Sequence, residues 1–115
     1  MKARVQFRLR IYRDDIAAIG PGKVALLESI AEQGSISGAA RQLGMSYRRA
    51  WMLIEELNSA LTHPAVATAT GGAKGGGARL TPVGEKIIRH YRAIEVSAKL
   101  AASEDVAQLT GLLAP

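Results

Sequence analysis

The chain has 115 residues, with 15 Lys and Arg against 10 Asp and Glu, and it contains no cysteine. This length predicts one domain with a single modest core, and the lack of cysteine excludes disulfides and thiolate metal sites. The net charge of +5 favours a polyanionic partner, and because no segment resembles a signal peptide or reaches the roughly 18 apolar residues of a membrane span, we expect a soluble, cytoplasmic protein.

The first predicted element is a strand near the N-terminus. Apolar residues alternate there with polar ones, at Val5, Phe7, Leu9 and Ile11. A period of two is typical of a half-buried strand, and Arg4, Arg8 and Arg10 give this one a basic outer face. We expect that face to be solvated, with phosphate contact as the minor alternative, and the strand to pair with a later hairpin.

A helix is predicted from about Pro21 to Gly34. Proline is tolerated in the first turn, and glycine is typical just past the end of a helix. One face of this helix is apolar and predicts burial, through Val24, Leu26, Leu27, Ile30 and Ala31.

The stretch from Gly34 to Asn58 predicts two short helices joined by a tight turn. Ala39 and Ala40 allow close packing, Gly44 permits positive φ, and the Ser46 hydroxyl suits a helix start. The second helix, residues 46–61, has one apolar face formed by Ala50, Leu53, Ile54, Leu57 and Leu61. Arg48 projects almost opposite this face and Arg49 to one side. This layout predicts a helix-turn-helix whose second helix enters a DNA major groove.

A β-hairpin wing is predicted after this helix. Residues 65–70 and 78–80 are candidate short strands, and the loop Gly71–Gly77 between them holds six glycines around Lys74. A nucleotide-binding loop is disfavoured because Lys74 is followed by Gly75 and not by the Ser or Thr that binds Mg²⁺. The remaining alternative for this loop is a disordered linker.

The last predicted helix begins at Thr81-Pro82, and residues 1–104 form the predicted winged-helix domain. Its length and a second apolar edge favour a dimer, and the predicted interface is the stripe Val83, Ile87, Tyr91, Ile94, Ala98 and Ala101. Residues 105–115 are predicted to be a short tail without placed structure. The predicted fold class is mainly α (α+β): a winged helix-turn-helix with an N-terminal strand, a three-helix core, a wing and a long C-terminal helix.

Candidate DNA contacts follow from this layout. Arg48 and Arg49 are predicted to reach base edges or phosphates, and the alternative is a solvated helix start with two surface arginines. The full predicted set is Ser35, Ser37, Ser46, Tyr47, Arg48, Arg49, Met52, Lys74 and Arg79, together with the wing-loop glycines Gly71, Gly72, Gly75, Gly76 and Gly77. No catalytic or metal site is expected, since His63 and His90 lie on different predicted elements without partner ligands.

Several of these residues resemble known families. Gly34-Ser35-Ile36-Ser37, Ala39-Ala40, Leu43 and Ser46 resemble the helix-turn-helix of LysR-type regulators. A narrower resemblance, to the N-terminal DNA-binding domain of the ModE-type molybdate-responsive regulators, rests on Ser46-Tyr47-x-x-Ala50-Trp51, Glu56-Leu57-Asn58, Thr70-Gly71-Gly72 with Gly75-Gly76-Gly77, and Leu80-Thr81 with Gly84.

The ModE resemblance implies a homodimer that binds a palindromic operator in double-stranded DNA and represses molybdate-uptake genes. It also implies that residues 46–49 and the wing face DNA. Members of that family sense molybdate through C-terminal β-barrel domains, and residues 1–115 contain none, so no cofactor is expected in this chain. Two other functions are open at the sequence level: a protein-binding adaptor that reuses the fold, and a small oxyanion sensor that uses the glycine loop.

Overall fold

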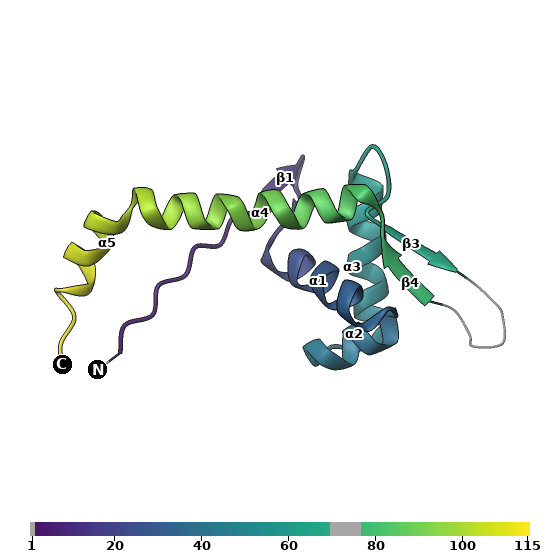
Figure 1. Cartoon of the computed structure of the whole chain (residues 1–115), viewed down its shortest axis with the longest axis horizontal. Helices are drawn as coiled ribbons and strands as arrows, with labels where there is room; N and C mark the ends of the chain where they lie inside the picture. Colours follow the sequence, from purple (N-terminus) through teal and green to yellow (C-terminus); the bar gives the residue numbers. More distant parts are fainter. Residues whose placement is uncertain (1, 70–76) are drawn as a thin grey trace.

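The computed structural model describes residues 2–69 and 77–115 and is mainly helical (Figure 1). The elements in chain order are β1 (Ile11–Arg13), β2 (Ile16–Ile19), α1 (Pro21–Gln33), α2 (Ile36–Leu43), α3 (Tyr47–Ala60), β3 (Val66–Ala69), β4 (Gly77–Leu80), α4 (Pro82–Ala101) and α5 (Ser103–Thr110). Helices α1–α3 gather beside the N-terminal half of α4, the β3–β4 wing projects at that end, and α5 lies at the other end. The predicted winged-helix architecture is confirmed.

Helix α1 lies at the centre of the core. Its largest buried side chains, Leu26, Leu27 and Ile30, pack against residues from α2, α3 and the wing. Ala39 of α2 and Ala50 of α3 are fully buried, and these small side chains let the two helices approach closely. The alternation of bulky α1 residues with alanines on its neighbours fills the space between three short helices without leaving voids.

Glycines and serines set the helix ends as the sequence predicts. Gly34 and Gly44 follow α1 and α2 in the left-handed conformation, with φ of 71° and 68°. Ser35 and Ser46 precede α2 and α3, and their hydroxyls accept hydrogen bonds from the amides of Gly38 and Arg49. The turn between α2 and α3 is therefore fixed at both sides by local chemistry.

The predicted N-terminal strand is wrong in its position and in its partner. Residues 5–10 are extended without strand pairing, and the first strand, Ile11–Arg13, pairs with Ile16–Ile19 in a local hairpin. Asp14, with φ of 55°, begins the two-residue turn. A two-residue turn closes a hairpin at far lower entropic cost than pairing with a wing some 55 residues away. The wing is consequently two-stranded.

Helix α4 is held against the end of the wing at its first turn. The Thr81 hydroxyl accepts from the Gly84 amide and donates to the Pro64 carbonyl. Gly84 is required there because a Cβ atom would lie 2.4 Å from the Ala65 carbonyl oxygen. Beyond α4, part of the segment predicted as an unplaced tail belongs to helix α5. No helix in the described ranges is long and apolar enough to cross a lipid bilayer.

Candidate nucleic-acid interface

The first turn of α3 presents polar and cationic side chains to solvent. Arg48 and Arg49 are exposed, and the exposed fractions of Tyr47 and Met52 are 49% and 59%. The opposite face is buried through Ala50, Ile54 and Leu57. Met52 follows Arg48 by one helical turn, so the two side chains lie on the same outward face.

The start of α3 also offers an anion-binding backbone. The Ser46 hydroxyl accepts from the Arg49 amide at 3.1 Å, which satisfies one amide of the first turn. The remaining amides at a helix start point outward and attract negative charge. The predicted capping by Ser46 is confirmed, and its predicted phosphate contact stays a prediction.

Tyr47 and Trp51 form an aromatic pair beside the arginines. Their ring centroids are 6.3 Å apart with the planes tilted by 36°. Trp51 is half-buried and packs against the core, so it supports the more exposed Tyr47 ring. Tyr47 therefore combines a packed ring with an accessible hydroxyl.

The two serines predicted near DNA at the start of α2 differ in their environment. Ser35 is half-buried, and its hydroxyl accepts from the Gly38 amide at 3.0 Å as the cap of α2. Ser37 is exposed in the first turn of the same helix. The structure therefore gives Ser35 a structural role and leaves Ser37 accessible.

The wing strands are attached to both helices of the motif. Val66 pairs with Leu80 and Ala69 with Gly77 in an antiparallel ladder, and Arg79 is exposed on β4. The Ala78 amide donates to the Gly34 carbonyl at 3.1 Å, which joins the wing to the α1–α2 turn. Gly77, predicted in the wing loop, is the first residue of β4. The other predicted wing residues, Lys74, Gly71, Gly72, Gly75 and Gly76, lie outside the described residues.

Asn58 ties the end of α3 to the wing, a role that the sequence pattern did not identify. Its side-chain carbonyl accepts from the amides of Ala65 (2.8 Å) and Val66 (3.4 Å), and its amide donates to the Val66 carbonyl at 3.2 Å. The signal available in the sequence is an Asn near a helix end, followed closely by a proline. Asn58 thus sets the position of the wing relative to the helix that carries Arg48.

Lys23 is a second residue whose role the sequence did not reveal. It is buried in α1, forms an ion pair with Glu56 of α3 and donates a hydrogen bond to the Ala17 carbonyl of β2. A buried ammonium group is costly unless it is paired and hydrogen-bonded. Lys23 therefore fixes the C-terminal half of α3, the half whose acidic residues were predicted to leave the groove.

The predicted dimer stripe divides between the core and the surface. Tyr91 is only 2% exposed and its hydroxyl donates to the Leu9 carbonyl at 2.9 Å, so its assignment to an intermolecular interface is corrected. Val83 and Ile87 are half-buried, and Ile87 packs against this chain's own core. Ile94 and Ala101 are exposed and Ala98 is half-buried, so the surface available to a second chain lies in the C-terminal half of α4.

Arg92 holds α4 to α1 at the border between these two halves. Its guanidinium donates to both carboxylate oxygens of Glu28 on α1 and to Glu95 one turn along α4. Hydrogen bonds to Glu28 are the largest cause of the raised pKa of Arg92, followed by the bond to Glu95. Bidentate geometry of this kind fixes direction as well as proximity.

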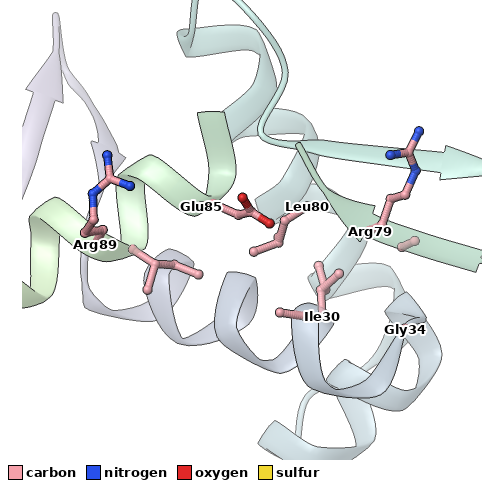
Figure 2. Close-up of a pocket in the computed structure, with 9 residues that line it drawn as sticks. Ile30, Gly34, Arg79, Leu80, Glu85 and Arg89 are labelled. Atoms are coloured by element: carbon pink, nitrogen blue, oxygen red, sulfur yellow. The ribbon is translucent and has the colours of Figure 1, made fainter. Parts of the chain in front are cut away.

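A cavity of about 490 Å³ lies between α1, β4 and α4. Figure 2 shows Ile30 and Leu80 facing each other at its apolar floor, while Arg79 and Arg89 project at opposite sides. An oxyanion site needs several donors that converge on one point, and these two guanidinium groups do not converge. Among the described residues, no cluster of three His, Asp or Glu side chains has the geometry to hold a metal ion.

Comparison with known proteins decides the family. Residues 22–85 match the model for bacterial regulatory helix-turn-helix proteins of the lysR family, a range that extends from α1 through the wing to the start of α4. The chain belongs to this lysR family. Its predicted LysR-type helix-turn-helix is thereby confirmed.

Curated relatives support the narrower resemblance to ModE. The chain is 51% identical over 88 residues to the molybdenum-pterin-binding protein MopB of Rhodobacter capsulatus, covering 76% of this chain and 33% of that protein. It is 36% identical over 118 residues to the DNA-binding transcriptional dual regulator ModE of Escherichia coli, covering 99% of this chain and 44% of that protein. The chain thus spans between a third and a half of the length of these two lysR-type relatives.

A solved structure agrees at the level of the fold. Full-length LTTR LysG from Corynebacterium glutamicum with bound effector Arg superimposes with a TM-score of 0.54 at 25% sequence identity. The match covers 81% of this chain and 29% of that one.

Proposed function

We propose that this chain binds double-stranded DNA through the first turn of α3 and the wing, as the DNA-binding part of a homodimeric repressor of molybdenum-related genes. The observation that carries the DNA assignment is the exposed first turn of α3, where Arg48 and Arg49 stand beside free helix amides. Membership of a family of regulatory helix-turn-helix proteins supports it. Such a protein works in the cytoplasm, where bacterial DNA lies.

The division of labour follows from side-chain chemistry. Arg48 and Arg49 contact guanine edges or phosphates, and Tyr47 and Ser37 donate hydroxyl hydrogen bonds to phosphate oxygens. Exposed Glu55 lies two turns beyond Arg48 on the same outward side, and its charge is repelled by phosphate. The helix therefore enters the groove by its N-terminal half. Arg79 of the wing adds a contact to the neighbouring backbone.

The molybdenum assignment rests on similarity to the ModE and Mop proteins. Because the chain covers only part of those relatives, control by molybdate is not assigned to residues 1–115. A reporter gene fused to a molybdate-transport promoter, with and without the chain, tests the direction of control. Lower expression with the chain supports repression, whereas unchanged or raised expression contradicts it.

Alanine substitution of the two arginines tests the DNA assignment. Arg48→Ala and Arg49→Ala should each weaken binding to a molybdate-transport promoter duplex by about 1–3 kcal/mol and relax specificity at one base position. Binding is measured by fluorescence anisotropy over a salt series, since DNA affinity must fall steeply with ionic strength whereas an apolar protein interface need not.

The matched control is Arg13→Ala on the β1–β2 hairpin. Figure 1 places this hairpin on the opposite side of α4 from α2, so its affinity should equal that of the parent. Lys74→Ala, at a position outside the described residues, should weaken all sequences alike and reduce the salt slope by about one unit. Unchanged affinity and sequence preference in both α3 variants contradict the assignment.

A further inference from the structure

The C-terminal part of the chain exposes large apolar side chains that nothing within the described residues covers. On α4 these are Ile94, Val96 and Leu100. On α5 and just beyond it, the exposed fractions of Leu109, Leu112 and Leu113 are 67%, 81% and 53%. A contiguous exposed surface of this kind marks an interaction site.

An apolar groove of about 210 Å³ lies at the other end of α4, between this helix and the N-terminal hairpin. The exposed cations Lys86 and His90 line it, together with the apolar side chains of Leu9, Ile11, Ile19, Ile87, Tyr91 and Ile94. Figure 1 shows the hairpin beside the middle of α4, well separated from α5. The groove and the exposed leucines therefore occupy different ends of the same chain.

The charges beside these two surfaces are opposite. Lys86, Arg89 and His90 are exposed on the N-terminal half of α4, and Glu104 and Asp105 are exposed in the first turn of α5. None of the five belongs to an ion pair formed within the described residues. At a rise of about 1.5 Å per residue, residues 90 and 104 are on the order of 20 Å apart in one chain. Only a second molecule can bring the two groups together.

A two-fold axis through the exposed part of α4 does so. The exposed apolar residues of α4 run from 94 to 100, and two antiparallel copies centred at residue 97 place residue 104 opposite 90 and residue 105 opposite 89. A parallel pair would instead bring Lys86 and Arg89 against the same residues of the partner, and like charges repel. The small side chains Ala98 and Ala101 let the two helices approach near the axis.

We propose that this groove binds helix α5 of a second copy, with Glu104 and Asp105 of one chain facing Lys86, Arg89 and His90 of the other. The exposed leucines of α5 then cover the apolar groove beside those charges. This inference rests on the proposed homodimer and names the contact that closes it. Because the arrangement is two-fold, each dimer contains the contact twice.

Charge reversal in two variants provides the test. The variant Lys86→Glu/Arg89→Glu makes both surfaces acidic, and the variant Glu104→Lys/Asp105→Lys makes both basic. Each variant alone should dimerise on the order of 100-fold more weakly than the parent, because both contacts in its homodimer join like charges. An equimolar mixture should form heterodimers close to the parent affinity, since both contacts then join opposite charges.

Sedimentation equilibrium measures all four samples, and Arg41→Glu/Arg48→Glu is the matched control. This control changes the net charge as much as the acidic variant does, on the helix-turn-helix surface, and should dimerise like the parent. As a second route, Leu109→Gln should weaken dimerisation without any change of charge.

Variants that dimerise like the parent, or a mixture that stays monomeric while Leu109→Gln has no effect, overturn the groove contact. In that case a dimeric parent leaves the proposed homodimer standing. A parent that sediments as a monomer at micromolar concentration contradicts both the groove contact and the homodimer, while the DNA assignment keeps its own anisotropy test.

Discussion

The winged-helix body, residues 20–91, and the projecting part, residues 2–10 with 92–115, treat their apolar side chains differently. In the body, the large apolar residues left exposed are Leu43, Tyr47 and Met52, and two of these lie on the predicted DNA face. The projecting part exposes Val5 and, along α4 and α5, a succession of residues from Ile94 to Leu113. The body is complete as a folding unit, whereas the projecting part has the surface of one half of an interface.

Polar groups show the same contrast. Lys23, Asn58 and Thr81 of the body each join two or more elements through hydrogen bonds, and no buried side-chain nitrogen or oxygen of the described residues lacks a partner. In α5, Glu104 and Asp105 are exposed and make no ion pair among the described residues. Exposed groups without partners are therefore the best guide to where this fold meets another molecule.

The largest expected difference between the two regions is in core packing. Ile30→Ala removes a fully buried side chain of α1 and should lower the free energy of unfolding by about 2–5 kcal/mol. Leu109→Ala removes an exposed side chain and should change it by less than about 0.5 kcal/mol in the dissociated chain. Urea denaturation of dilute protein measures both. Equal losses would show that α5 is part of the folding unit.

Asn58→Ala should have the next largest effect, a loss of about 3 kcal/mol, because three hydrogen bonds to the start of the wing disappear together. Asn58→Asp keeps the acceptor oxygen and loses only the donor to the Val66 carbonyl, so its loss should be smaller. The same urea titration compares them. Hydrogen exchange at the Ala65 and Val66 amides should accelerate in the alanine variant alone, and unchanged protection there contradicts the role given to Asn58.

Tyr91→Phe should have the smallest effect, about 1 kcal/mol, through loss of the hydrogen bond to the Leu9 carbonyl. Burial raises the pKa of Tyr91 above its ordinary value of 10.0, and the charge of Glu95 raises it further. The unfolded chain therefore loses the phenolic proton first as pH rises, so the stabilisation is present below pH 10 and declines through the alkaline range.

Stability measured between pH 9 and 11 checks this pH dependence. The parent should lose more stability over that range than Tyr91→Phe does, because only the parent carries the perturbed phenol. Parallel curves for the two proteins contradict the assignment of Tyr91 to the interior.

Local chemistry explains which parts of the fold could be predicted from the sequence. Gly34, Gly44, Ser46 and Thr81 each set a helix end through their own backbone or side chain, so the pattern within a few residues was sufficient. The hairpin was missed because the period of two continues from Val5 to Ile11 and gave more weight to one long strand than to a turn at Asp14.

Residues that depend on distant partners could not be predicted in the same way. Lys23 finds Glu56 a full 33 residues away, and a lysine near a helix start is ordinarily solvent-exposed. Tyr91 shares the helical period of Ile94 and Ala98, yet it faces this chain's interior while Ile94 is exposed. Periodicity identifies an apolar face of a helix and does not say which chain covers it.

The central claim is that the first turn of α3 reads DNA sequence, and selection from a randomised duplex library tests it most directly. The parent chain should enrich a palindromic motif whose half-sites are about 10–10.5 base pairs apart, one turn of the duplex. Arg48→Ala or Arg49→Ala should lose the preference at one position in each half-site. Enrichment of no motif, or of the same motif by a chain lacking both arginines, would contradict the claim.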